Sequence, residues 1–268
     1  MYPENVPIIF KTPKDFDHIV IYPIHDPHFG NECFDQQKYK TLVDEILSEP
    51  NHYVIWVGDL MENAIPNSKS DVFTQTLSPQ EQKDLVIEQF RLLGDRTIAI
   101  VAGNHEYNRT TRHVGLYPLY DCAVIAGIGD RYRNAYAVTD IYVGLGKQKN
   151  NKRQHDYVGY VTHQISELKK FGFADVLEGF DFLLCGHDHE PKDRPRMKIS
   201  YNRQRKGIEF KSIEVINCGS FLTYGGYGAR GPYRPLSDKY YKLILEGGFG
   251  KESTIQTVGY YLHNSDPS

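Results

Sequence analysis

Short apolar runs alternate with amphipathic stretches through the first hundred residues, and this alternation limits the folds that the chain can adopt. The runs at 18–24 (HIVIYPI), 52–58 (HYVIWVG) and 96–103 (RTIAIVAG) have the length and composition of strands. The stretches between them, at 36–48 and about 80–93, have the spacing of amphipathic helices. Two successive β-α-β units predict a parallel or mixed sheet with helices packed over it.

The second half of the sequence is richer in strands. Runs of β-like composition lie at 136–144, 156–163, 180–186, 198–202, 208–219, 240–245 and 255–262. We therefore expect an α/β protein with one domain over residues 1–268, whose C-terminal half supplies a second sheet. In this prediction the motif-bearing part is 18–223, and the strands at 239–262 complete the second sheet.

Composition gives broad limits on the class of protein. The chain has 268 residues, 40% of them hydrophobic, and a formal net charge of −3, so it is not expected to bind polyanions in general. The four cysteines are widely spaced, which predicts reduced thiols and no disulfide framework. No apolar stretch approaches the roughly 20 residues that span a bilayer, and the N-terminus lacks the apolar run of a signal peptide. We expect a cytoplasmic protein with no membrane partner.

Five of the expected strands end in side chains that can bind a metal. The strand ends, in chain order, are His25-Asp26-Pro27-His28, Gly58-Asp59, Gly103-Asn104-His105-Glu106, His163 and Gly186-His187-Asp188-His189. One such ending could be an ordinary turn or a structural histidine. Five in one chain favour a site, because ligands of α/β proteins bind at the carboxyl edge of the sheet.

The donor types point to one kind of metal chemistry. Imidazole, carboxylate and amide oxygen suit Mn²⁺, Fe²⁺, Zn²⁺ or Ni²⁺. Cys185 is the one thiol within these motifs, so a structural zinc site rich in cysteine is disfavoured.

The ordered motifs D-x-H, G-D-x-x-E, G-N-H-E, H and G-H-x-H run from Asp26 to His189, and Asn217-Cys218-Gly219-Ser220 follows them. This series resembles the calcineurin-like metallophosphoesterase superfamily. The resemblance implies two packed mixed β-sheets flanked by helices, and a phosphoester hydrolase that uses two divalent metal ions. Mn²⁺ is the preferred candidate, with Fe, Zn, Ni and Mg as alternatives. Two such cations can share a hydroxide and clamp a phosphate for in-line attack.

The resemblance also implies a role for each residue of the motifs. One metal would be held by Asp26, His28 and His189, the other by Asn104, His163 and His187, and Asp59 would bridge them. The catalytic residues would be Asp59 and His105, with His105 facing the phosphate as a charge stabiliser and candidate proton donor.

Two glutamates beside these ligands have alternative interpretations. Glu62 would either support the metal ligands or be an acid at a helix N-terminus, and Glu106 would either orient His105 or be a solvated turn residue.

The substrate is less constrained by the sequence. In the Ser/Thr phosphatases of the superfamily an arginine follows the second motif and binds phosphate, whereas here Asn63 and Ala64 follow it. This difference favours the nuclease and phosphodiesterase branches. Candidate substrate-binding residues are Asn104, His105, Arg194, Arg196, Arg203, Arg205, Tyr224 and Tyr227. The basic run after His189 and a second one at 147–153 could equally be solvated surface, and the tyrosines could belong to a packed loop.

Three functions follow from these observations. The leading hypothesis is a phosphodiesterase or nuclease acting on DNA, RNA or nucleotides. The alternative is a phosphomonoesterase acting on a small metabolite or a phosphoprotein. A third, from another class, is an inactive scaffold of the same fold, which is disfavoured because every expected ligand is present.

Overall fold

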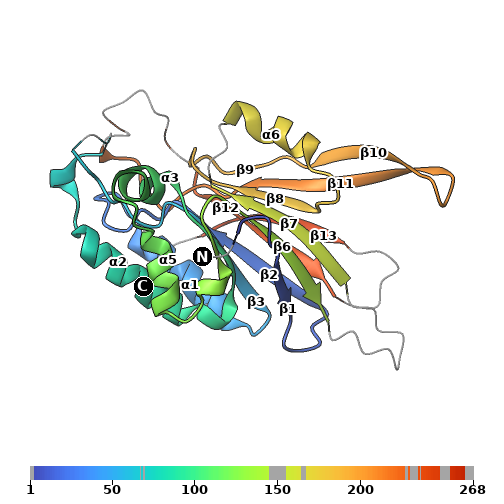
Figure 1. The fold of residues 1–268 in the computed structure, drawn as a ribbon, viewed down its shortest axis with the longest axis horizontal. Coiled ribbons are helices and arrows are strands. Elements are labelled where there is room, and N and C mark those ends of the chain that lie inside the picture. Colours follow the sequence, from blue (N-terminus) through green and yellow to red (C-terminus); the bar gives the residue numbers. More distant parts are fainter. Residues whose placement is uncertain are drawn as a thin grey trace.

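The computed structural model describes residues 3–66, 68, 70–144, 155–163, 167–226, 229, 235, 237–247 and 254–262. They form four layers, in which two β-sheets pack face to face and helices cover the outer face of each (Figure 1). This arrangement confirms the expected α/β fold of two mixed sheets with flanking helices.

The first sheet has the strand order β13-β12-β2-β3-β4-β5. Strands β2 to β5 are parallel, and β12 and β13 are antiparallel to their neighbours. The bounds are β2 (His18–Ile24), β3 (His52–Val57), β4 (Thr97–Val101), β5 (Tyr132–Arg133), β12 (Lys239–Glu246) and β13 (Ile255–Tyr261).

The second sheet has the order β1-β6-β7-β8-β11-β10, and β9 pairs with β11 outside this path. Parallel pairs join β1 to β6, β7 to β8 and β8 to β11, whereas β6–β7 and β10–β11 are antiparallel. The bounds are β1 (Ile8–Lys11), β6 (Tyr136–Val143), β7 (His155–Thr162), β8 (Phe182–Cys185), β9 (Lys192–Asp193), β10 (Arg196–Asn202) and β11 (Gly207–Asn217).

The longer helices lie on the outer faces of the sheets. On the first sheet these are α1 (Gln36–Ser48), α2 (Pro79–Leu92) and α5 (Pro118–Ile125), and on the second it is α6 (Glu167–Val176) (Figure 1). Helix α2 begins with a capping box between Ser78 and Glu81. The structure describes no helix that is long and apolar enough to cross a membrane.

The shorter helical segments are η1 (Val72–Thr74), η2 (Gly94–Arg96), α3 (Asn104–Glu106), η3 (Tyr107–Thr111), α4 (Arg112–Val114) and η4 (Gly129–Arg131).

The core explains why the central strands are continuous apolar runs. Every residue of β3 and β4 is buried, because helices cover one face and the second sheet covers the other. In β8, Phe182 and Leu184 face the core between the sheets, while Leu183 packs beneath α6. The main core contains residues of both sheets, with Trp56 and Tyr22 among its largest side chains.

The last two strands lie in a different place from the one expected. From the sequence we expect 239–262 to complete the sheet of the C-terminal half, but β12 pairs with β2 and so extends the first sheet. Pairing with β3 leaves the other edge of β2 with unpaired backbone groups, and β12 satisfies them with Leu243 opposite Ile21, both fully buried.

Candidate metal centre

The metal-competent side chains converge at one end of the two sheets. Strands β2, β3 and β4 of the first sheet lead into Asp26 and His28, Asp59, and Asn104, respectively. Strands β7 and β8 of the second sheet lead into His163, and His187 with His189. The structure therefore brings together all seven residues predicted as metal ligands.

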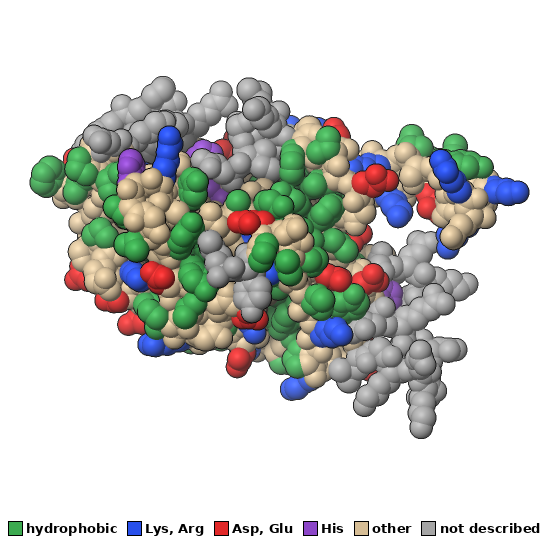
Figure 2. Space-filling view, in the orientation of Figure 1, with side chains coloured by type: hydrophobic (Ala, Val, Ile, Leu, Met, Phe, Trp, Pro, Cys, Tyr) green, Lys and Arg blue, Asp and Glu red, His purple; other side chains and the backbone are tan. Residues whose placement is uncertain are grey.

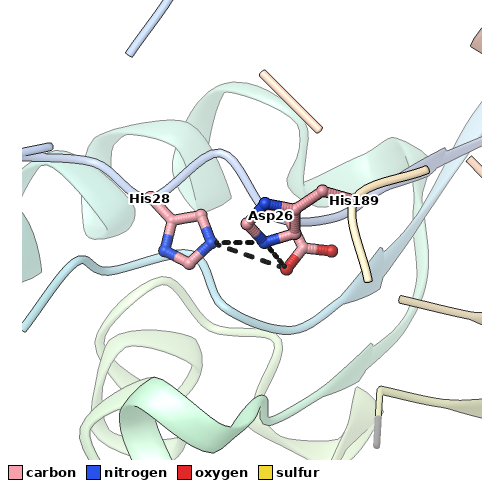
Figure 3. A group of neighbouring side chains, drawn as sticks. All are labelled: Asp26, His28 and His189. Atoms are coloured by element: carbon pink, nitrogen blue, oxygen red, sulfur yellow. Dashed lines mark hydrogen bonds and ion pairs between the residues drawn. The ribbon is translucent and has the colours of Figure 1, made fainter. Parts of the chain in front are cut away.

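One group consists of Asp26, His28 and His189, whose rings point toward the carboxylate (Figure 3). Asp26 Oδ1 lies 3.5 Å from Nε2 of His28 and 3.1 Å from Nε2 of His189. The two ring nitrogens are 3.1 Å apart. Three donor atoms thus face a common point.

A second group consists of Asp59, His163 and His187. His163 Nε2 lies 3.2 Å from Asp59 Oδ2 and 3.1 Å from Asn104 Oδ1, and His187 Nδ1 lies 2.7 Å from the same amide oxygen. Asp59 Oδ2 is also 4.0 Å from His28 Nε2. Asp59 consequently lies between the two groups, where a bridging ligand would have to be.

The buried charges of the site explain its pKa shifts. Burial disfavours ionisation of Asp26, but the charges of His189 and His163 hold the pKa of this carboxyl well below its ordinary value. Burial likewise opposes ionisation of Asp59, and the neighbouring histidines, with a hydrogen bond from His163 among their interactions, lower its pKa nonetheless. Both carboxylates are therefore anionic at neutral pH.

The donor set fits a divalent cation. Asp26 Oδ1 is buried and has no hydrogen-bond partner, although three ring nitrogens surround it. A buried carboxylate needs positive charge beside it, which these rings supply when protonated and which a bound metal cation would supply in their place. Imidazole with carboxylate and amide oxygen suits the borderline divalent metals.

The backbone at the ligands is unusual. Asp26, His28, Asp59, His187 and His189 all have positive φ, from 49° to 84°. Such values are uncommon for residues other than glycine, and each costs roughly 1–3 kcal/mol unless the surroundings enforce it. Five strained ligands in one cluster indicate that the fold holds these side chains in place for a function.

Two glycines allow the strand ends to approach one another closely. A Cβ on Gly103 would lie 2.1 Å from Asp59 Oδ1, and a Cβ on Gly186 would lie 2.9 Å from Asp26 Oδ2. The glycine before Asn104 and the one before His187 are therefore required by contact, not by turn conformation alone.

Glu62 supports a metal ligand. The side chain is buried, and its Oε2 lies 3.3 Å from His28 Nδ1 and accepts a hydrogen bond of 2.8 Å from Asn31 Nδ2. A carboxylate on one ring nitrogen directs the other toward a cation. Of the two interpretations from the sequence, this geometry matches the support of a ligand.

Glu106 has a role that the sequence did not indicate. Its carboxylate is buried and accepts hydrogen bonds from the backbone N–H of Gly103, Asp59 and Met61, at 2.9, 3.1 and 2.9 Å. It neither is solvated nor orients the His105 ring; it fastens the loop after β3 to the loop after β4. Burial, followed by the charge of Asp59, raises the pKa of Glu106 to about 7.

Arg109, on η3, is a functional candidate that sequence reasoning missed. Its Nη2 donates to His105 Nε2 at 2.8 Å and its Nη1 donates to Glu62 O at 2.6 Å. A guanidinium only donates, so His105 Nε2 accepts and Nδ1, 2.8 Å from Glu62 O, is the protonated nitrogen. The G-N-H-E motif gave no signal for an arginine five residues after Asn104.

This contact bears on the role expected for His105, which stays a prediction. Burial, the largest cause, lowers the pKa of His105 to about 3 against the opposing charge of Asp59. The ring is neutral, and the positive charge at this position belongs to Arg109. His105 also has a donor atom within 4.8 Å of donor atoms of His28 and Asp59, so a metal-binding role for His105 is a further alternative.

The predicted substrate residues are spread widely. Tyr224 is half exposed and follows Thr223, whose N–H donates to Cys33 O, so this loop lies beside the loop that follows His28. Arg194 and Arg196 are at the near end of the β10–β11 hairpin, whereas Arg203 and Arg205 are in its turn. Tyr227 and the basic run at 147–153 lie outside the described residues.

The turn of the hairpin is remote from the metal ligands. Asn217 marks the near end, because its side chain donates to Asp188, between the ligands His187 and His189. The 11 residues of β11 extend about 30 Å from there to the turn.

The fold and the site together define a class of protein, the metal-dependent phosphoesterases. The model of the calcineurin-like phosphoesterase family matches residues 24–191, and the chain belongs to this family. No curated protein matches the sequence.

Solved structures with a related fold are distant in sequence. Vps29 from Chaetomium thermophilum is 11% identical, with 91% of this chain and 100% of that chain covered and a TM-score of 0.40. A metallophosphoesterase from Sphaerobacter thermophilus is 13% identical, with 91% and 89% covered and a TM-score of 0.40. Family membership follows from the family model alone.

Proposed function

We propose that this chain hydrolyses phosphoesters with two divalent cations, Mn²⁺ being the preferred metal, and that its substrate is a phosphodiester of a nucleic acid or nucleotide. One observation supports this most strongly: Asp59 lies between the group of Asp26, His28 and His189 and the group of His163 and His187. A single carboxylate shared by two donor sets suits a pair of cations, and a structural site for one metal does not need it.

Divalent cations bound to these residues would activate water and polarise the phosphoryl oxygens. The residues of the chain then have separate tasks. Asp59 and Asp26 supply negative charge, and the histidines with Asn104 supply neutral donors. Glu62 orients His28, and Glu106 fixes the position of Asp59 relative to Asn104.

Arg109 is proposed to bind the substrate phosphate together with His105. Its side chain is only 10% exposed and reaches His105, which lies 3.7 Å from Asp59 Oδ2. Asn63 occupies the position where Ser/Thr phosphatases have their arginine, and its amide donates to His105 O and Thr110 Oγ1. Asn63 thus holds the segment that presents Arg109, and the arginine comes from a different place in the sequence.

The preference for a diester rests on the sequence motif and on the basic residues at the near end of the hairpin, Arg194 and Arg196. The turn residues Arg203 and Arg205 would be reached only by a polynucleotide of about nine nucleotides. A nucleotide or a short oligomer would engage Arg109, Asn104 and Tyr224 alone.

Metal removal and a pair of model esters test the proposal. After dialysis against a chelator, hydrolysis should be lost, and Mn²⁺ should restore it better than Ca²⁺, which prefers more oxygen ligands. The restored protein should cleave bis-p-nitrophenyl phosphate faster than p-nitrophenyl phosphate, and labelled DNA and RNA should then be compared. Faster cleavage of the monoester would contradict the choice of substrate.

The same experiment addresses the alternative of an inactive scaffold. Protein that binds two equivalents of Mn²⁺ and cleaves none of these esters would support a scaffold. Full activity in a demonstrably metal-free preparation would reject the metal mechanism itself.

A further inference from the structure

The β10–β11 hairpin extends from the second sheet beyond the rest of the described fold. Strand β10 is the last in the order of its sheet and pairs with β11 from Arg196–Ile213 to Asn202–Gly207. In Figures 1 and 2 the hairpin stands clear of the rest of the molecule at one end of its long axis. An isolated two-stranded hairpin is only marginally stable in water, which makes an exposed one of this length a candidate for a contact surface.

The register of the hairpin separates two faces of different character. Ile199 lies opposite Phe210 and Tyr201 opposite Ile208, with Met197 on the same face. These five side chains form the apolar hairpin face, and each is between 63% and 71% exposed. Arg196, Lys198 and Lys211 lie on the opposite face, whose inner end packs against α6.

The apolar hairpin face continues the inner surface of the sandwich. Along β11, Phe210 is on the same side as Glu214 and Ile216, and Ile216 belongs to the main core between the sheets. The first sheet covers this surface near Ile216, and no described strand lies opposite it at Phe210. Exposed apolar surfaces of this kind mark sites of association.

The charges at the two ends of the apolar hairpin face limit which partner can bind it. At the turn are three cations, Arg203, Arg205 and Lys206, of which Arg205 makes one ion pair with Glu209, at 3.5 Å. At the inner end is Glu214, whose carboxylate accepts hydrogen bonds from the hydroxyls of Ser212 and Thr257. The apolar face is therefore basic at one end and acidic at the other.

We propose that this face binds the same face of a second copy of the chain, in an antiparallel dimer with two-fold symmetry. Phe210 lies on β11, four residues after Lys206 of the turn and four residues before Glu214. A two-fold axis through the Ile199–Phe210 pair therefore places the basic turn of each copy over Glu214 of the other. The same packing covers both sets of apolar side chains.

Other partners fit these features less well. A nucleic acid would bind the cations and would stack on Tyr201 and Phe210, but it would leave the aliphatic side chains of the face exposed and would be repelled by Glu214. An anionic membrane would accept the apolar side chains and the basic turn, but it would repel Glu214. The second copy is complementary to the apolar centre and to both charged ends.

Sedimentation of the full chain tests the dimer. The contact surface is small, so we expect reversible dimerisation in the micromolar range, at the weak end of specific interfaces. Ile199→Asp with Phe210→Asp should give a monomer across this range without lowering the melting temperature. Lys211→Ser, an exposed change on the opposite face of the hairpin, is the matched control and should still dimerise.

Charge reversal distinguishes the antiparallel arrangement from any other contact. The turn variant is Arg203→Glu with Arg205→Glu and Lys206→Glu, and the inner variant is Glu214→Lys. Each variant alone should be a monomer, because like charges would meet. Mixed in equal amounts, they should form a heterodimer, since each turn would then face an opposite charge.

Several results would overturn the proposal. A wild-type chain that is monomeric throughout the micromolar range excludes it, whether or not the chain then floats with anionic vesicles or binds an oligonucleotide. A dimer that persists in the variant with Ile199→Asp and Phe210→Asp forms through another surface. Failure of the mixed variants to associate, with both correctly folded, excludes the antiparallel geometry.

Discussion

Arg109 and His105 form a pair in which each side chain limits what the other can do. The guanidinium donates to Nε2 of the ring. The carbonyl of Glu62 accepts from Arg109 Nη1 at 2.6 Å and from His105 Nδ1 at 2.8 Å. The same guanidinium donates to Glu62 Oε1 and to Ser70 Oγ, each at 3.3 Å. An anion would therefore bind at Nε or replace one of these two longer contacts.

If Arg109 binds the transferred phosphoryl group, Arg109→Ala should lower kcat by roughly 10²–10³-fold, the usual cost of one such donor. Arg109→Lys should recover part of the rate, because it restores the charge without the forked geometry. Steady-state kinetics on the model diester measures both. Arg112→Ala, at an exposed position three residues further on, is the control and should leave kcat unchanged. Equal rates for the Ala variant and wild type would remove Arg109 from the site.

The roles of Asp59 and His105 can be distinguished by the metal content of a variant at each position. Asp59→Asn removes the charge between the two ligand groups, so we expect it to lose metal as well as rate. His105→Ala should retain both metals and lose turnover, by an amount of order 10²–10⁴-fold if it acts on the transition state. Elemental analysis of both variants is the measurement. Loss of one metal equivalent from the His105 variant would show that His105 is a ligand, as its distance from His28 and Asp59 permits.

At the scale of elements, the site depends on how closely the turns after β3 and β4 approach each other. Gly103→Ala would place its Cβ 2.1 Å from Asp59 Oδ1 and 2.2 Å from Asp59 N, both in a buried loop. We expect the metal-free protein to be destabilised by several kcal/mol and metal binding to weaken, because the loop must shift. Gly172→Ala in α6 meets no atom within 4 Å and should be neutral or stabilising by up to about 1 kcal/mol.

Thermal unfolding and metal titration of both glycine variants check this expectation. The two changes add the same methyl group, so they differ only in what surrounds it. A Gly103 variant with wild-type metal affinity would show that the loop adjusts without cost, and the close approach would not be essential.

The positions of the ligands could be predicted from the sequence for a simple reason. Apolar runs such as HIVIYPI and HYVIWV define buried parallel strands, and parallel strands end at one common edge. Polar residues that follow these runs must therefore lie near one another. All seven predicted ligands do so, although they come from both sheets.

The supporting residues could not be predicted in this way. Arg109 reaches His105 because a π-helical turn follows the G-N-H-E motif, and the role of Glu106 depends on N–H groups from a separate loop. The positive φ of His187 likewise has no signature in the residue type. These features arise from contacts between segments distant in sequence, as does the pairing of β12 with β2.

For the molecule as a whole, the centre joins the two sheets. Asp26 and Asp59 come from the first sheet, and His163 and His189 come from the second. A cation bound between them would link the sheets directly, so metal binding should raise the stability of the fold by mass action. The metal must compete with protons for the same nitrogens, and the pKa values of the ligands determine the outcome.

The stabilisation by metal should increase with pH. Burial lowers the pKa of His28, but hydrogen bonds to Asp26 and Glu62 outweigh it and raise the pKa to about 10; for His163, the charges of Asp59 and Asp26 outweigh burial and raise it to about 9. Raised histidine pKa values stabilise the metal-free fold fully below their unfolded value of about 6.5, and this contribution is lost as pH rises toward 9 and 10. Metal binding has the opposite dependence, because it requires the deprotonated rings.

Melting temperatures with excess Mn²⁺ and with chelator should therefore differ more at about pH 8.5 than at about pH 6.5. In the His28→Asn variant this widening should be smaller, because one competing proton is gone. A difference that stays constant over this range would mean that the rings do not exchange protons for metal.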